Sequence, residues 1–178
     1  QYTAGQVKTL LQFDPSRIHV VHHGVNPVPQ LPEESLDAFR RASGLQEPFL
    51  LSVGGIQERK NTARILEVFE RMPLHYRLVL AGSTGYGAKE IMERLEKSSA
   101  RNRILLTGYV NNSVLAKLYR TAELLLFPSL EEGFGFPIIE AMSAGLPVVT
   151  SNCSAMPEVA GRAAILVDPE NVDSIEAG

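Results

Sequence analysis

The sequence predicts an α/β fold, a doubly wound parallel sheet of the Rossmann-like kind. Short apolar runs alternate with amphipathic segments along the chain, and continuous apolar strands are typical of a parallel sheet covered on both faces. Most of these runs are followed directly by Gly, Ser or Asn, which favour turns at strand ends. Because ligands of such folds bind beyond the carboxyl ends of the strands, we expect function in the loops that follow them.

Strands and helices are expected in alternation. The expected strands are short and rich in leucine or β-branched residues: 18–22, 49–53, 77–81, 104–107, 123–127, 147–150 and 164–167. The expected helices are amphipathic: 3–12, 33–42, 62–71, 88–98, 113–121, 137–144 and a last one that starts near Val172. Asn61 and Asn112 fit helix caps, Pro137 fits a first turn, and Gly145 fits a helix end. A chain of 178 residues with this pattern predicts one main domain.

Composition excludes several classes of function. A net charge of -3 without runs of like charge argues against a broad nucleic-acid-binding face. The single cysteine, Cys153, excludes an internal disulfide and suits a reducing compartment, so we expect a cytoplasmic protein. No apolar run approaches the roughly 18–20 residues that cross a membrane. The chain begins with Gln1 rather than Met, and we expect it to be a piece of a longer protein.

Residues 129–145, SLEEGFGFPIIEAMSAG, are the most informative stretch. They follow an apolar strand and combine a turn with two glycines, a proline and a short helix closed by Gly145, an arrangement whose unpaired N–H groups can bind an anion. Glu132 and Glu140 stand eight positions apart across this turn, and we expect Glu140 in the first turn of the helix, near the strand ends. Carboxylates beside an anion site must contact something else, and sugar hydroxyls are the obvious candidates.

A basic pair, Arg59 and Lys60, follows the strand 49–53 and the glycine turn at Gly55. Two cations at the carboxyl end of a strand can neutralise a leaving diphosphate without a metal. A glycosidase also uses two carboxylates, but hydrolysis of a glycosidic bond does not need this basic pair. Transfer from a nucleoside diphosphate does.

These motifs resemble the signature of the retaining nucleotide-sugar glycosyltransferases of group 1, the glycogen-synthase-like GT-B type. In that signature two glutamates are separated by seven residues, and residues 132–148, EGFGFPIIEAMSAGLPV, match it almost completely. The resemblance extends to residues 23–26, 59–61, 157–159 and 164–169, and it covers only the second half of the family's length. It implies the C-terminal half of a GT-B fold, with residues 1–14 as the end of a connector helix and residues 15–178 as the donor-binding domain.

The resemblance also implies a role for each site residue. Glu140 would hold the ribose of the donor, Lys60 and Arg59 the diphosphate, and Glu132 the sugar, so that Glu132, Lys60 and Arg59 form the catalytic group. Many members carry an arginine where this chain has Gly55, and Arg59 would substitute for it. The remaining donor-binding residues that the resemblance implies are Gly133, Phe134, Gly135, Phe136, Gly55, Gly82, Gly108, Tyr109 and Val110. Phe134 and Phe136 are expected to pack rather than to form a substrate platform.

The implied activity is transfer of a hexose to an acceptor hydroxyl with retention, in polysaccharide or glycolipid biosynthesis. The Arg-Lys-Asn form of residues 59–61 suggests a mannosyltransferase that uses GDP-mannose, with UDP- and ADP-sugars as alternatives. We expect no cofactor and no metal. The partners would be the nucleotide sugar and an acceptor glycan or lipid held by a missing N-terminal domain, without which this chain should be inactive. The full-length protein could contact the inner face of the membrane.

Other interpretations remain open. The loop 82–89, GSTGYGAK, resembles a P-loop, but Ala88 displaces the lysine and Glu90 stands where Ser or Thr should follow. It also lacks the G-x-G-x-x-G order of a dinucleotide fingerprint. A nucleotide-sugar epimerase, or a non-catalytic module that senses nucleotide sugars, could use the same fold. A sensing module would tolerate the loss of Glu132 or Lys60, and both are present. A phosphorylase would need a pyridoxal-bearing lysine motif that the sequence lacks.

Overall fold

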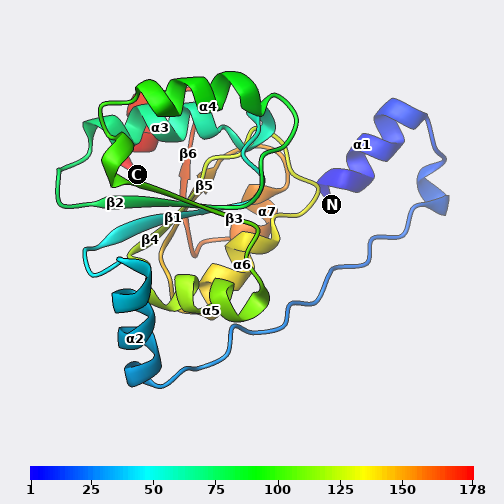
Figure 1. Ribbon diagram of the computed structural model, residues 1–178. Coiled ribbons are helices and arrows are strands. Elements are labelled where there is room, and N and C mark those ends of the chain that lie inside the picture. Colours follow the sequence, from blue (N-terminus) through cyan, green and yellow to red (C-terminus); the bar gives the residue numbers. More distant parts are fainter.

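The computed structural model describes all 178 residues and contains one sheet of six parallel strands between layers of helices (Figure 1). The strands are β1 (Phe49–Val53), β2 (Arg77–Ala81), β3 (Ile104–Gly108), β4 (Leu124–Phe127), β5 (Val148–Ser151) and β6 (Ile165–Val167). Their order across the sheet is β3-β2-β1-β4-β5-β6. The chain therefore changes direction across the sheet between β1 and β4, which is where ligands bind in sheets of this kind.

Helices cover both faces of the sheet, with α3 and α4 on one face and α5 and α6 on the other (Figure 1). The helices are α1 (Tyr2–Leu11), α2 (Glu33–Ser43), α3 (Thr62–Arg71), α4 (Ala88–Lys97), α5 (Asn112–Thr121), α6 (Phe136–Ser143), α7 (Met156–Ala160) and α8 (Val172–Ala177). Short 3₁₀ turns lie at Pro15–Arg17, Glu58–Lys60 and Arg101–Arg103. Helix α8 packs on α3, and α2 packs on α5. No helix combines the length and the apolar character that a bilayer crossing requires.

Two apolar layers form the core, one on each face of the sheet. Neighbouring residues of a strand point to opposite faces, so Leu50 belongs to the layer under α3 and α4 while Leu51 belongs to the layer under α5 and α6. In β4, Leu125 and Leu126 divide between the layers in the same way. Continuous apolar runs are thus explained by burial on both faces, and the predicted doubly wound parallel sheet is confirmed.

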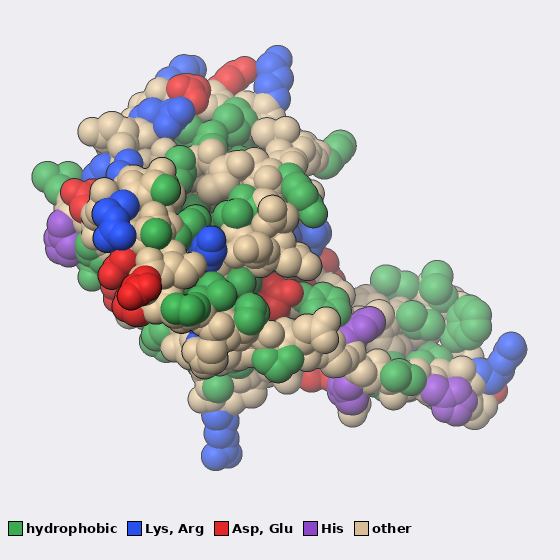
Figure 2. Space-filling model, turned by 60° about the horizontal axis from the view of Figure 1, so that its bottom comes forward, with side chains coloured by type: hydrophobic (Ala, Val, Ile, Leu, Met, Phe, Trp, Pro, Cys, Tyr) green, Lys and Arg blue, Asp and Glu red, His purple; other side chains and the backbone are tan.

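Most of the predicted elements form within one or two residues of their expected bounds. The strand expected at residues 18–22 is wrong, because the chain is extended there but pairs with no strand. This segment follows α1 on an arm that stands out from the body of the molecule (Figures 1 and 2), and Val21 is 84% exposed. A strand needs a neighbour that satisfies its backbone N–H and C=O groups, and neither edge strand, β3 or β6, supplies one.

The arm is joined to the body through the segment before α2. Arg120 of α5 donates hydrogen bonds to the carbonyl oxygens of Val28 (2.6 Å) and Pro29 (3.1 Å) and to that of Ala144 (3.0 Å) after α6. The backbone N–H of Val28 donates to the hydroxyl of Ser143 at 2.9 Å. One guanidinium therefore fixes this segment across the ends of two helices.

Candidate active site

The candidate site lies at the carboxyl edge of the sheet, between β1 and β4. The 3₁₀ turn Glu58–Lys60 follows β1, and residues 128–135 connect β4 to α6. The backbone N–H of Leu130 donates to the carbonyl oxygen of Arg59 at 2.9 Å and ties the two loops together. Two loops that are 70 residues apart in sequence thus form one surface at the switch point of the sheet.

Glu132 is buried and pairs with both predicted cations. Its Oε1 accepts from Lys60 Nζ at 2.6 Å, and its Oε2 lies 2.9 Å from Nη1 of Arg59. The ammonium of Lys60 also lies 4.5 Å from the centroid of the Phe127 ring, within the range of a cation–π contact. One carboxylate therefore faces two cations, and this cluster keeps a net positive charge.

The ammonium of Lys60 is largely removed from solvent. Burial lowers the pKa of Lys60 below its ordinary value of 10.5, and the hydrogen bond that Lys60 donates to Glu132 opposes this effect. An ammonium has three N–H donors, and Glu132 takes one of them. A buried cation with donors to spare gains from an anion that replaces its lost hydration.

Asn61 holds the loops of this site together, a role that the sequence interpretation as a helix cap missed. It precedes α3 in a left-handed conformation (φ 58°), and its side chain makes no capping bond. Instead its buried amide donates to the carbonyl oxygens of Pro128 (3.0 Å) and Pro169 (2.7 Å). The loops after β1, β4 and β6 meet at this one side chain. The available signal was the residue type, because asparagine is one of the few residues that adopt the left-handed conformation readily.

The second expected cap also shifts by one residue: Asn111, rather than Asn112, caps α5, with its side chain accepting from Val114 N at 3.0 Å.

The predicted glycines converge at the ends of β1, β2 and β3. A methyl group on Gly82 would lie 2.0 Å from the carbonyl oxygen of Gly54, and Gly82 itself bridges to Gly108. A methyl group added to Gly55 would lie 3.3 Å from the carbonyl oxygen of Ser83. Beyond them, Tyr109 is exposed and Val110 is half-buried. Gly54 in turn lies against Lys60, whose Cε would be 2.8 Å from an added methyl group. Close packing therefore places Gly82 against Gly54, which itself lies against the side chain of Lys60.

Glu140 lies in the second turn of α6, because the helix starts at Phe136, and the expected first-turn position is wrong. Its Oε2 accepts a hydrogen bond of 2.8 Å from the hydroxyl of Tyr119, a buried residue of α5. Sequence reasoning missed Tyr119. The available signal was that a buried tyrosine hydroxyl usually finds a partner.

Two hollows meet at Phe136. A cleft of about 670 Å³ lies between the arm and residues 132–137, with Lys60 and Glu132 in its wall. A smaller one of about 360 Å³ is lined by Glu140, Tyr119 and residues 24–29. Phe136 lines both. Gly133, Phe134 and Gly135 line the larger cleft. The two glutamates of the motif thus line adjoining hollows, Glu132 the larger one and Glu140 the smaller one.

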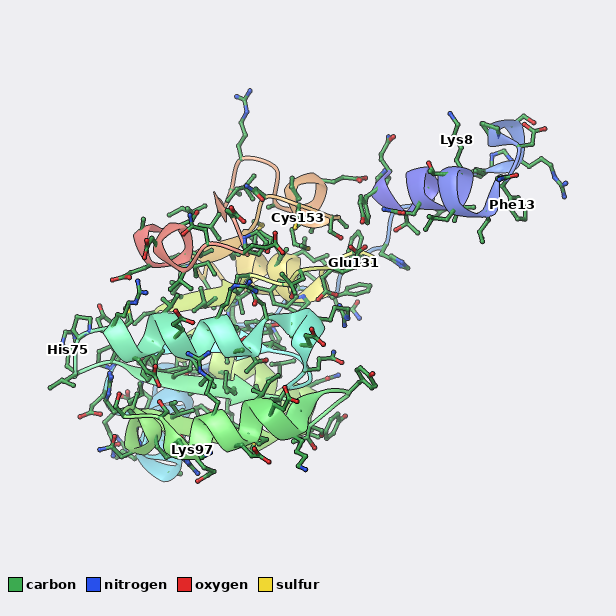
Figure 3. The ribbon with its side chains drawn as sticks, turned by 90° about the horizontal axis from the view of Figure 1, so that it is seen from above. Lys8, Phe13, His75, Lys97, Glu131 and Cys153 are labelled. Atoms are coloured by element: carbon green, nitrogen blue, oxygen red, sulfur yellow. The ribbon has the colours of Figure 1, made fainter.

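The arm rests on the loop that carries Glu132. His23 packs its ring against Phe134 and Phe136, with centroids 5.1 and 5.2 Å apart. Thr3 donates to the carbonyl oxygen of Gly133, and the hydroxyl of Tyr2 donates to Glu131 at 2.7 Å. Figure 3 shows Glu131 at the side of the body that faces α1.

Other titratable side chains lie outside the cluster. Glu158 accepts a hydrogen bond from the backbone N–H of Tyr2 at 3.0 Å. Burial raises the pKa of the Cys153 thiol, which suits the neutral form rather than a nucleophilic thiolate. His75 lies at the opposite end of the body (Figure 3). No three His, Cys, Asp or Glu side chains gather closely enough to hold a metal ion.

Comparison with known proteins agrees with the motif. Residues 35–178 match the profile of the family described as glycosyl transferases group 1. The chain belongs to this family. Among curated group 1 relatives, O-antigen chain mannosyltransferase B of Escherichia coli is 35% identical over 154 residues, which are 84% of this chain and 40% of the relative. The chain thus spans less than half the length of that enzyme.

Solved glycosyltransferases show the same fold. WaaG, a glycosyltransferase involved in lipopolysaccharide biosynthesis, superposes with a TM-score of 0.83 at 24% identity, over 97% of this chain and 49% of its own. Anabaena HepE in complex with UDP and glucose superposes with a TM-score of 0.82 at 18% identity, over 92% of this chain and 46% of its own. Both superpositions confirm the predicted fold, which is that of one half of a GT-B glycosyltransferase.

Proposed function

We propose that residues 15–178 form the domain that binds the nucleotide-sugar donor of a retaining hexosyltransferase, with residues 1–14 as the end of a connector helix. The observation that carries the proposal is the cluster of Lys60, Arg59 and Glu132 at the switch point of the sheet. A nucleoside diphosphate would take the N–H donors that Glu132 leaves free. Family membership supports this assignment.

The donor would extend along the carboxyl edge of the sheet. Its ribose hydroxyls would bind Glu140, and its base would lie near Tyr109 and Val110, beyond Gly55, Gly82 and Gly108. Its sugar would lie in the larger cleft beside Glu132 and the loop 133–136. The position of Phe136 between the two hollows supports a ligand that runs from one to the other.

Lys60 and Arg59 would act by stabilising charge. When the bond between the sugar and the diphosphate breaks, negative charge grows on the phosphate oxygens, and two cations fixed in place can stabilise it without reorganisation. Removing one such donor typically costs about 10²–10³ in kcat. Glu132 would hold both cations in register before the donor arrives and contact the sugar afterwards. The acceptor hydroxyl would come from a preceding domain, so this chain alone should bind donor but not transfer sugar.

The donor sugar proposed here is mannose, carried by GDP. The support is the mannosyltransferase relative at 35% identity and the Arg-Lys-Asn sequence at residues 59–61. HepE, the solved structure with UDP and glucose, shares the fold at 18% identity, so a UDP-sugar is the alternative donor and UDP is included in the titration below. The product would belong to a polysaccharide or glycolipid, made at the cytoplasmic side of a membrane.

Calorimetric titration tests the proposal. The chain is titrated with GDP, UDP and ADP without divalent metal, as wild type and as Glu140→Gln. We expect saturable binding of GDP in preference to the others, and weaker binding by the variant. Glu123→Gln, a change at an exposed glutamate before β4, is the matched control and should bind as wild type. Absence of binding to all three nucleotides would refute the proposal.

A further inference from the structure

The buried Tyr119 and the half-buried Glu140 form a hydrogen-bonded pair between two helices that face the same side of the sheet. Tyr119 is 2% exposed and packs among core residues from the strands and from α6. Its hydroxyl reaches out of this core to Glu140, at the wall of the smaller hollow, and donates to Oε2 at 2.8 Å. No other hydrogen bond within the chain holds the Glu140 carboxylate. Its orientation therefore depends on one phenol.

We propose that Tyr119 is a positioning residue that sets the orientation of the Glu140 carboxylate and thereby the preference of the site for a ribose with both hydroxyls. The inference rests on the proposed role of Glu140 and deepens it. A carboxylate receives two adjacent hydroxyls well only when both of them lie near its plane, since hydrogen bonds to sp² oxygens prefer that plane and weaken steeply away from linear geometry. With Oε2 tethered, Oε1 and the remaining lone pair of Oε2 are presented to the hollow in one fixed direction.

The environment keeps Tyr119 a donor. Burial, and then the nearby Glu140 charge, raise the pKa of Tyr119 far above its ordinary value of 10.0, so the phenol stays protonated. The ring is fixed by the core on all sides, which means that little conformational entropy is lost when the hydroxyl meets the carboxylate. A water molecule in the same place would satisfy Oε2 but would not fix the carboxylate.

The test compares nucleotides with and without ribose hydroxyls. GDP and UDP, and their 2′,3′-dideoxy counterparts, are titrated into the 178-residue chain as wild type, Tyr119→Phe and Tyr76→Phe. Tyr76 is the matched control, because it is half-buried and its hydroxyl makes no hydrogen bond within the chain. We expect Tyr119→Phe to bind the ribonucleotide roughly tenfold more weakly, the loss expected for about one hydrogen bond, and to bind the dideoxy nucleotide as wild type does. Tyr76→Phe should change neither.

A second readout is the coupling between the two residues. In a Glu140→Gln background, Tyr119→Phe should add little further loss, because the carboxylate that it positions is already gone. Full additivity of the two losses would overturn the inference.

The other outcomes separate the inference from the proposed function. Equal losses for ribo- and dideoxy nucleotides would show that Tyr119 acts only through the core, and a preserved ribose preference in Tyr119→Phe would show that it does not position Glu140. Either overturns the inference alone. A wild-type chain that does not distinguish the two nucleotides, or binds neither, overturns the role of Glu140 as well.

Discussion

Replacing Asn61 with alanine should destabilise the chain more than any other single change of an asparagine. The side-chain amide is buried and donates to two carbonyl oxygens, those of Pro128 and Pro169. Each acceptor left without a partner costs about 1–3 kcal/mol, and alanine in the left-handed conformation costs about 1–2 kcal/mol more. We therefore expect a loss of about 3–8 kcal/mol in the free energy of unfolding, measured by urea denaturation at an unchanged m-value.

Three matched variants make this test sharp. Asn61→Gly removes the same hydrogen bonds without the left-handed strain, so it should recover about 1 kcal/mol relative to alanine. Asn61→Asp places a carboxylate against two carbonyl oxygens and should be at least as harmful as alanine. Asn102→Ala, at an exposed position, should cost less than about 0.5 kcal/mol. Wild-type stability in Asn61→Gly would show that the two hydrogen bonds of the Asn61 amide do not stabilise the fold and that only the backbone conformation matters.

Lys60 and Gly82 give three further expectations. Lys60→Ala should weaken binding of a nucleoside diphosphate far more than binding of the nucleoside. Equal losses of affinity for the two ligands in calorimetry would show that Lys60 does not contact the phosphates. Because burial lowers the pKa of Lys60, its charge is lost at a lower pH than that of a free lysine. Diphosphate affinity measured from about pH 7 to pH 10 should fall as pH rises in the wild type but not in Lys60→Arg, and parallel profiles would contradict this. Gly82→Ala should cost more than about 3 kcal/mol of stability, since the methyl group would lie 2.0 Å from the carbonyl oxygen of Gly54. Gly108→Ala has open space and should cost only about 1–2 kcal/mol; similar thermal unfolding of both variants would show that the Gly82 contact relaxes.

The alternation of strands and helices could be predicted because burial on both faces gives each strand a continuous run of apolar residues. Leu50 and Leu51, adjacent and both buried, are one instance. The prediction of a strand at residues 18–22 was wrong because the sequence of a segment does not show whether a neighbouring strand is available. Its β-branched pattern indicates a strand, but strand formation depends on a neighbour, and this chain offers none.

The site residues could be named from the sequence, but their contacts could not. Lys60 and Glu132 are 72 positions apart and form an ion pair at 2.6 Å only because β1 and β4 are neighbours in the sheet. The bond from Tyr119 to Glu140 likewise depends on how α5 and α6 pack. Motif spacing reports which residues share a loop, while the tertiary fold decides which loops meet.

The decisive measurement is the structure of the chain bound, without divalent metal, to the nucleoside diphosphate that has the highest affinity. We expect phosphate oxygens on Lys60 and Arg59, ribose hydroxyls on Glu140, and a longer distance between Lys60 Nζ and Glu132 than the present 2.6 Å. A nucleotide bound instead in the hollow of about 720 Å³ between the starts of α3 and α4, beside Arg64 and Lys89, would contradict this expectation.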